Sequence, residues 1–246
     1  MRTTLTNIET HEFLKELFKD ATQFLGDKEF EITDVELPES VDLDELQYYI
    51  HNVGFYTIYL IKWCKQLEIG VDLLSNFDYK TKSEYNRVDH LSYNIENYII
   101  RFQSVSDRLL QVINSVFHLT IDEANVSNNI VMTNLKVART SIPSKFSPIK
   151  KYLKKFYDDR NTIVHRHSYL EKELRTLELF YHENNADVDE RIKYFRSRKL
   201  KEYIKAKKER FDKYNQDLFK LLPDLFDDLL NEYRKQRDKL IILTRK

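Results

Sequence analysis

The sequence contains few of the residues that break or end regular structure. Its 246 residues include only three glycines and four prolines. Tight turns and helix breaks should therefore be rare, which favours long helices joined by short loops. Hydrophobic residues make up 41% of the chain and charged residues 33%. This balance excludes a disordered chain and allows a real core, in one large domain or two small ones.

Cysteine and long apolar runs are also scarce. The single cysteine, Cys64, excludes an internal disulfide framework and a multi-cysteine metal site. Because it lies in the apolar run 53–64, we expect a buried side chain rather than a reactive thiol. That run is too short to cross a bilayer, and residues 1–25 alternate charged and apolar residues at helical spacing, unlike a signal peptide. We therefore expect a soluble, cytoplasmic protein with no membrane partner.

The chain has no excess of charge of one sign. Its 40 basic and 40 acidic residues cancel, so any basic surface for a nucleic acid must be local. Two basic clusters are present, one formed by Lys150, Lys151, Lys154 and Lys155 and the other by Arg196, Arg198, Lys199, Lys201, Lys205, Lys207, Lys208 and Arg210. Each is either a solvated helix face or a surface for RNA phosphates. No Asp, Glu and His residues have metal-ligand spacing, so we predict no cofactor.

Hydrophobic periodicity predicts an all-α bundle. Apolar residues recur at intervals of three and four over 9–25 and, most clearly, over 88–119. A further helix is expected from a cap at Ser40 or Asp42 to about Leu67, and others over 130–137, 187–222 and 224–242. Residues 30–37 alternate weakly and are compatible with a short extended segment. Because no repeat and no domain linker is evident, we expect residues 1–246 to form a single domain.

One short segment, Arg160-Asn161-Thr162-Ile163-Val164-His165, concentrates the chemistry of the chain. Arginine is a permanent cation that matches phosphate in geometry, and histidine exchanges a proton near neutral pH. With a polar residue beside the arginine, these residue types can form a compact RNA-cleaving site. Spacing alone favours a structural role, because Arg175 and His182 fit the same loose pattern.

The sequence is compatible with two layouts of this segment. In the first, Ser147 caps a helix that starts at Pro148 and continues to Tyr181. Arg160 and His167 would then interrupt the core stripe of this helix. Such an interruption indicates a polar pocket or a subunit boundary, because a buried cation is costly unless it is paired.

In the second layout, Asp158 or Asp159 caps a new helix. Arg160 would then lie in the first turn and could bend toward His165. The helix N-terminus would also help to hold a phosphate. The sequence does not choose between the two layouts.

The full segment resembles the Arg-x4–6-His signature of the HEPN superfamily, which comprises small all-α domains, many of them RNases. Members commonly place a polar residue after the arginine and apolar residues before the histidine, as Asn161, Ile163 and Val164 do here. The resemblance implies that Arg160 and His165 are the catalytic pair and that Asn161 assists them. It also implies a HEPN-like core at about 88–181, with helical additions at 1–86 and 187–246.

The motif can also be aligned with the family signature in a second way. Many toxin-type members continue with the pattern H-x-Y, which is missing after His165 but is restored if His167 is the family histidine and Tyr169 the tyrosine. Both histidines are therefore candidates, with His165 first. A carboxylate should steady Arg160 when no substrate is bound, and Glu96 and Asp107 on the helix predicted at 88–119 are the candidates for this role.

The resemblance also implies the reaction and the partners. HEPN RNases cut RNA without a metal, in a site completed by two copies of the motif across a homodimer. The expected route is attack of the ribose 2′-OH on the adjacent phosphate, with histidine as general base and Arg160 stabilising the phosphorane. Many such enzymes are toxins or antiviral effectors that an antitoxin or another regulatory protein keeps silent. The alternative is a non-catalytic helical module that binds RNA, a nucleotide or a protein.

Overall fold

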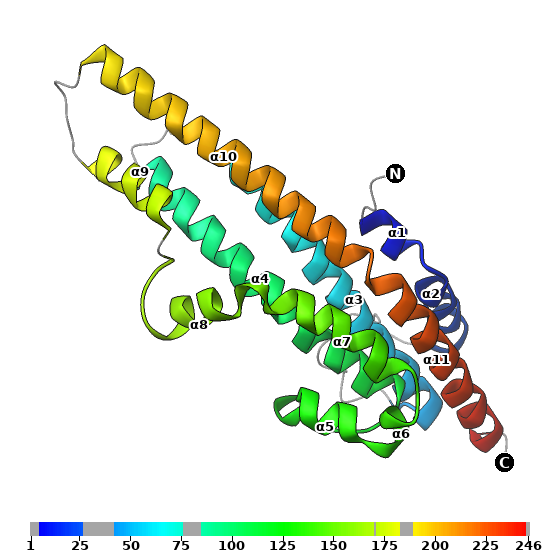
Figure 1. Ribbon diagram of the computed structural model, residues 1–246. Coiled ribbons are helices and arrows are strands. Elements are labelled where there is room, and N and C mark those ends of the chain that lie inside the picture. Colours follow the sequence, from blue (N-terminus) through cyan, green and yellow to red (C-terminus); the bar gives the residue numbers. More distant parts are fainter. Residues whose placement is uncertain (1–4, 27–41, 76–84, 170, 183–188, 245–246) are drawn as a thin grey trace. The chain divides into compact units, whose positions relative to one another are not determined.

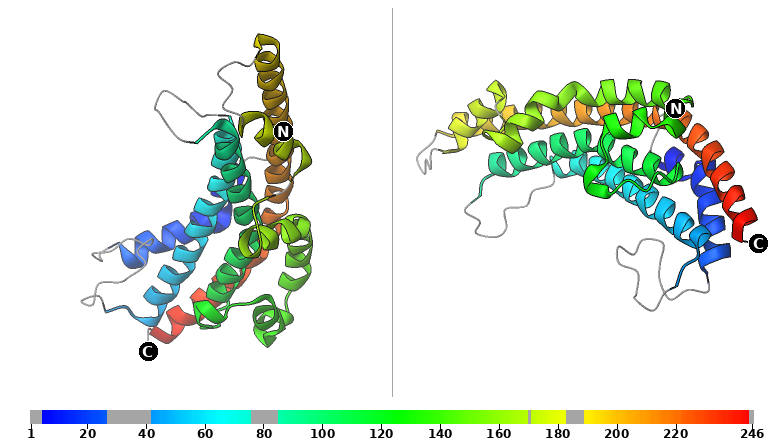
Figure 2. Two further views of the ribbon diagram at one scale, coloured as in Figure 1. Left: turned by 90° about the vertical axis from the view of Figure 1, so that its left-hand side faces the viewer. Right: turned by 90° about the horizontal axis from the view of Figure 1, so that it is seen from below.

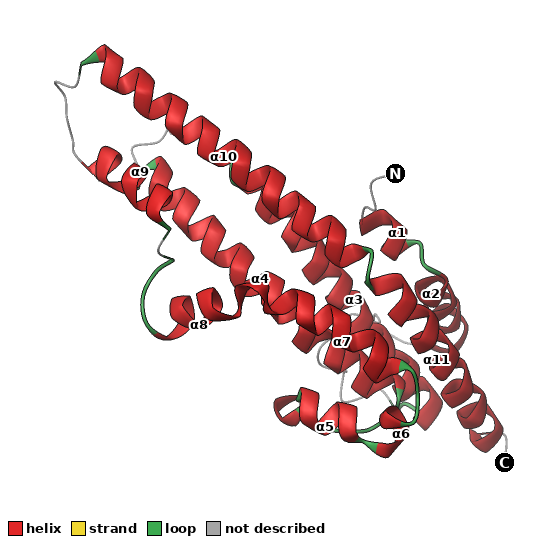
Figure 3. Cartoon of the chain, in the orientation of Figure 1, coloured by secondary structure: helices red, strands yellow, loops and turns green. Residues whose placement is uncertain are grey.

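The computed structural model describes residues 5–26, 42–75, 85–169, 171–182 and 189–244. All regular elements in these ranges are helices (Figure 3), which confirms the predicted all-α class. The α-helices are α1 (Leu5–Glu9), α2 (Glu12–Leu25), α3 (Glu45–Leu73), α4 (Arg87–Val116), α5 (Asn128–Thr133), α6 (Leu135–Ala138), α7 (Ile142–Leu153), α8 (Tyr157–His165), α9 (Lys172–His182), α10 (Glu190–Phe219) and α11 (Leu222–Thr244) (Figure 1). The 3-10 helices are η1 (Glu123–Asn125) and η2 (Lys154–Phe156). The extended segment expected at 30–37 lies outside the described residues.

The chain forms two compact units. Unit 1 consists of Met1–Lys65, Ser104–Leu153 and Leu218–Lys246, and unit 2 consists of Gln66–Gln103 and Lys154–Asp217. The candidate motif belongs to unit 2. None of the described helices is both long enough and apolar enough to cross a membrane.

The stripe that the sequence predicts over 88–119 is confirmed. All of its apolar residues are buried along α4, namely Val88, Leu91, Ile95, Ile99, Phe102, Val105, Leu109, Val112 and Val116. The Cys64 side chain is also buried, as expected. Periodicity is reliable in these helices because their apolar faces are wide and continuous, so that burial of the whole face outweighs local exceptions.

The helix start predicted at Ser147 and Pro148 is wrong. Helix α7 begins at Ile142 and contains Pro148 in its interior, although an interior proline removes one backbone hydrogen bond. Contacts with α11 in unit 1 hold the first turns of α7. The Lys145 Nζ atom donates to the backbone oxygen of Asp224 at 2.9 Å and lies 3.1 Å from Asp228 Oδ2. Tertiary packing therefore extends the helix upstream of the local start signal.

The single helix predicted over 148–181 is also wrong. The chain leaves the helical path at η2, starts again as α8 and ends that helix at His165. The physical reason lies in the aromatic core of unit 2, which takes up Phe156. The Phe156 ring packs edge-on against Phe102 at a centroid distance of 5.5 Å, and against Tyr98 and Phe211 at 6.3 and 6.2 Å.

This aromatic core joins α4 and α10. The rings of Tyr98 and Phe211 stack at 3.9 Å with an interplanar angle of 6°. The buried Tyr98 hydroxyl donates to Asn215 Oδ1 at 2.9 Å, so its polar atom is satisfied. Burying Phe156 in this cluster turns the chain between α7 and α8 and thereby sets the start of the helix that carries the motif.

In unit 1 an ionic network joins α2 to α11, which lie side by side (Figures 1 and 2). Glu16 accepts from Arg234 Nε at 2.8 Å and from Arg237 Nη1 at 2.7 Å. Arg237 Nη1 also donates to Asp20 Oδ2 at 2.8 Å, and the buried Tyr233 hydroxyl donates to the same oxygen at 2.9 Å. The hydrogen bond from Arg234 lowers the pKa of the Glu16 carboxyl, and Arg237 lowers it further against the opposing effect of burial.

We predict that Glu16→Gln lowers the free energy of unfolding at pH 7 by about 1.5–3 kcal/mol, the range for hydrogen bonds to charged groups. Because the folded-state pKa of Glu16 is lowered, its contribution is present above the ordinary carboxyl pKa of about 4.3 and is lost as the pH falls through the folded value. Urea denaturation from neutral to acidic pH should therefore show a difference that disappears in acid. Glu12→Gln, at an exposed residue paired with Lys15, is the control and should have little effect. A difference independent of pH would contradict this account.

Candidate functional site

Helix α8 brings Arg160, Asn161 and His165 onto one short element with no buried residue. The second layout is therefore right that a new helix starts before Arg160. It is wrong about the cap, because Phe156 occupies that position and makes no side-chain hydrogen bond there. Asp158 and Asp159 lie in the first turn instead, where carboxylates interact favourably with the helix dipole.

The Arg160 guanidinium is half-buried and donates from Nη1 to Asn161 Oδ1 at 3.2 Å. Within the described part of the chain, no carboxylate lies within ion-pairing distance of it. Glu96, expected to steady Arg160, instead accepts a hydrogen bond from the backbone amide of Tyr169 at 2.6 Å. Asp107, the other candidate, belongs to unit 1. Most of the donors of Arg160 are thus available for an anionic ligand.

The two histidines differ in position. His165 is the last residue of α8, and His167 lies in the segment 166–169 that follows; both are exposed. The expectation that His167 interrupts a core stripe is therefore wrong, because the helix has already ended. The amides of Arg166 and His167 both donate to the backbone oxygen of Thr162, at 2.9 and 3.0 Å, which closes the helix.

The hydrogen bond of His167 defines its tautomer. Its Nδ1 lies 2.9 Å from the backbone oxygen of Ser168. A carbonyl oxygen only accepts, so Nδ1 must carry the proton in this contact, which leaves Nε2 of the neutral ring as an acceptor. His165 has no hydrogen-bond partner among the described residues, and its ring is open to a ligand.

A buried ion pair anchors the segment that follows the motif. Lys207 on α10, only 5% exposed, places Nζ 2.7 Å from Oε2 of Glu171, the residue that precedes α9. Tyr203 donates its hydroxyl to the same carboxylate. The Lys207 ammonium also lies 5.4 Å from the centre of the Tyr169 ring, a cation–π distance. Tyr169 is thus held both by Lys207 and by Glu96.

The run of basic residues at 196–210 hides this anchor in the sequence, because it places Lys207 among lysines and arginines expected at the surface. The structure corrects that assignment, because a buried and paired lysine cannot contact RNA phosphates. A usable signal was present: Tyr203, Lys207 and Phe211 follow one another at intervals of four residues and share a face of α10. Tyr203 and Phe211 are buried, so the residue between them on that face is buried too.

The surroundings of the motif shift two pKa values. Burial raises the pKa of the Asp159 carboxyl; Asp158 and Glu171 add to this shift and Lys207 opposes it. Burial also raises the pKa of the Tyr169 phenol, with contributions from Glu171 and Asp159. Tyr169 therefore remains a neutral hydrogen-bond donor at physiological pH.

The basic cluster at 150–155 is divided between the two units. Lys150 and Lys151 lie in the last turn of α7 in unit 1, whereas Lys154 and Lys155 lie in η2 in unit 2 and are exposed. The Lys155 ammonium lies 4.0 Å from the centre of the Tyr214 ring. Among the described residues, no three His, Cys, Asp or Glu side chains are grouped so that they could hold a metal ion.

We predict that Lys207→Met lowers the free energy of unfolding by about 3 kcal/mol, because the Glu171 carboxylate loses its buried partner. Urea or thermal denaturation measures this loss. Lys205→Met is the matched control on the same helix, since Lys205 is exposed and its ion pair with Glu209 is long, at 4.0 Å. We expect the free energy of unfolding of this variant to change by no more than about 0.5 kcal/mol. The double variant Lys207→Met/Glu171→Gln should recover part of the loss. Equal effects of Lys207→Met and Lys205→Met would disprove the anchor.

Comparison with known proteins identifies a family. The chain matches the family model described as Cthe2314-like HEPN over residues 39–230, which is more than half of its length and includes α8. The match extends on both sides of 88–181, from before α3 into α11. No curated protein and no solved structure matches the chain.

Proposed function

The chain belongs to the HEPN superfamily, and on this premise we propose that it is a metal-independent endoribonuclease whose active site is centred on α8. The observation that carries the proposal is the placement of Arg160, Asn161 and His165 on one short helix without a fully buried residue, within the matched region. His165 is exposed and Arg160 is half-buried, so both side chains have surface that a phosphate can contact.

The proposed reaction needs a base, an acid and a cation, and the residues of α8 and 166–169 supply all three types. A neutral imidazole takes the proton of the ribose 2′-OH while its oxygen forms a bond to the adjacent phosphorus. The bond to the 5′-oxygen breaks, and a second imidazole or water protonates that oxygen. Arg160 neutralises the charge of the phosphorane. The products are a 2′,3′-cyclic phosphate and a 5′-hydroxyl.

The contacts of the remaining residues give each of them a separate role. Asn161 accepts a hydrogen bond from Arg160 and so orients the guanidinium toward the phosphate. His165 is the first candidate for the base, and the acceptor Nε2 of His167 makes it the second. Tyr169 and Glu96 act as positioning residues, because their mutual hydrogen bond holds the backbone two residues after His167. Lys154 and Lys155 attract the RNA backbone.

A second copy of the chain completes the proposed site. Helix α8 leaves apolar surface uncovered, with Val164 45% exposed and Tyr157 51% exposed. Pairing two copies through α8 would cover these side chains and bring together two sets of the motif. As in toxin-type HEPN proteins, we propose a toxin or antiviral role in which an antitoxin or regulatory protein controls the enzyme.

We predict that the purified protein cuts mixed RNA in the presence of EDTA, and that Arg160→Ala and His165→Ala each slow cleavage at least about a hundredfold. Arg175→Ala is the matched control, because Arg175 belongs to the decoy pattern and is exposed on α9. His167→Ala in the same series identifies which histidine is the main base. Intact RNA in all reactions, with RNA binding retained, would refute the nuclease and support a non-catalytic module.

We also predict that Val164→Glu converts a dimeric wild type into monomers and lowers cleavage, because two buried carboxylates would face each other across the α8 contact. Sedimentation velocity measures the oligomeric state. Leu179→Glu is the control, because Leu179 is an exposed apolar residue on α9 and not on α8. A wild type that cleaves RNA as a monomer would exclude the composite site.

A further inference from the structure

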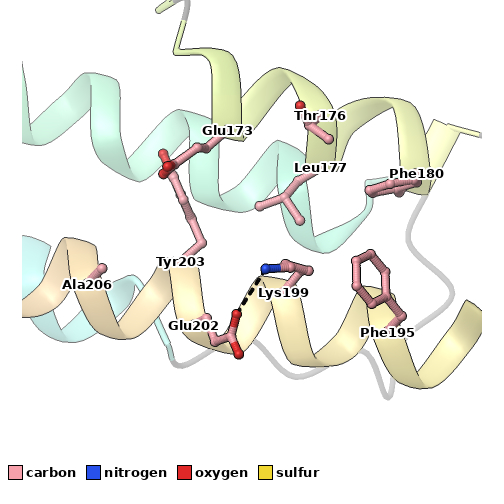
Figure 4. A pocket seen from close by; sticks show the side chains of 9 residues that line it. All are labelled: Glu173, Thr176, Leu177, Phe180, Phe195, Lys199, Glu202, Tyr203 and Ala206. Atoms are coloured by element: carbon pink, nitrogen blue, oxygen red, sulfur yellow. Dashed lines mark hydrogen bonds and ion pairs between the residues drawn. The ribbon is translucent and has the colours of Figure 1, made fainter.

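Unit 2 contains a cavity of about 430 Å³ between α9 and α10 (Figure 4). Its apolar part is formed by Leu177 and Phe180 of α9 and by Phe195 of α10. The Phe180 and Phe195 rings meet at one end at a centroid distance of 6.4 Å and an angle of 89°. Its volume is in the range of sites for small organic groups.

Charged side chains also line the cavity. Lys199 and Glu202 of α10 form an ion pair at 3.3 Å, and Glu173 of α9 lies near Tyr203 (Figure 4). Flat aromatic walls stack on nucleobases regardless of sequence. Carboxylates accept hydrogen bonds from the exocyclic amino groups of bases. Apolar rings beside such acceptors therefore suit a base better than an aliphatic ligand.

The face of α10 that lines the cavity continues toward the motif. Phe195, Lys199 and Glu202 recur at intervals of three and four, and Arg210 follows on the same face. Arg210 is close enough to Asp159 and Tyr169 to perturb both electrostatically. The helical rise places Lys199 and Arg210 roughly 16 Å apart along the axis. A short single strand can span that distance.

The charge of α10 is complementary to such a strand. Its exposed basic side chains outnumber its exposed carboxylates and comprise Arg191, Lys193, Arg198, Lys199, Lys201, Lys205, Arg210 and Lys213. Glu202 and Glu209 pair with some of them, which leaves a net positive helix. A nucleic acid binds more tightly to such a series of basic side chains, because its phosphates release their bound cations.

We propose that the cavity between α9 and α10 is a nucleobase subsite: it seats one base of a single-stranded RNA whose backbone follows α10 toward α8. The subsite deepens the proposed nuclease function, on which its role in cleavage rests. Base binding itself does not require that function. A cavity that holds a base at a set distance from α8 would position the cut relative to that base.

The test measures binding and cleavage separately. The probe for binding is a short, fluorescent, 2′-O-methyl oligoadenylate, which lacks the attacking hydroxyl and cannot be cut by the proposed route. Its affinity for the full chain is measured by fluorescence anisotropy. We expect Phe195→Ala to weaken binding about tenfold, within the range for loss of one stacked base. Phe195 is already 48% exposed, so the fold should tolerate the change, and thermal unfolding checks this.

Tyr194→Ala is the matched control, because Tyr194 is the neighbouring aromatic residue on α10, is 72% exposed and does not line the cavity. We expect it to bind the probe like the wild type. With unmodified RNA, Phe195→Ala should raise KM and leave kcat largely unchanged. Failure of the wild type to cut RNA would overturn the proposed function but not the subsite.

Three results would overturn the subsite: no binding of the probe by the wild type, equal binding by Phe195→Ala and the wild type, or equal losses in Phe195→Ala and Tyr194→Ala. AMP is tested in parallel as a competitor. If AMP competes with an affinity equal to that of the oligonucleotide, the cavity binds free nucleotides, and the proposed role of the RNA strand along α10 is wrong.

Discussion

The buried pair of Lys207 and Glu171 is the interaction on which the arrangement of the motif region depends. It joins the start of α9 to the middle of α10 at 2.7 Å. The chain between α8 and α9 is thereby held at its far end, while Phe156 in the aromatic core holds the near end of α8. A buried lysine is tolerated here because a carboxylate, the Tyr203 hydroxyl and aromatic rings surround the pair.

Between these two anchors, no residue of α8 is fully buried. Such a helix gains little from its own unit, and its position depends on the fixed segments on either side. This freedom suits a site that must admit a phosphate and meet a second copy. The same anchors bear on the cavity between α9 and α10, because Tyr203 both lines it and donates to Glu171. The interaction of Glu171 with Lys207 and Tyr203 therefore stabilises both the proposed cleavage site and the proposed base-binding site.

Prediction from the sequence succeeded where a helix has a broad apolar face. The stripe of α4 is buried from Val88 to Val116 as its spacing predicts. It failed between 142 and 171, where Pro148 lies inside α7 and the expected single helix is broken at η2. Local signals such as a serine before a proline contribute about 1 kcal/mol. Burial of one aromatic ring contributes more, so packing prevails where the two conflict.

The all-α class, the long helix α4 and the residue types of the motif follow from the amino-acid sequence, because hydrophobic periodicity and composition are properties of neighbouring residues. Four features emerge only in the folded chain: α8 is a separate helix, His167 is exposed, Glu96 accepts from the amide of Tyr169, and Lys207 is buried. These outcomes depend on contacts between residues distant in the chain. Whether a residue is buried or hydrogen-bonded depends on the side chains that surround it after folding. Its neighbours in the sequence do not specify these side chains.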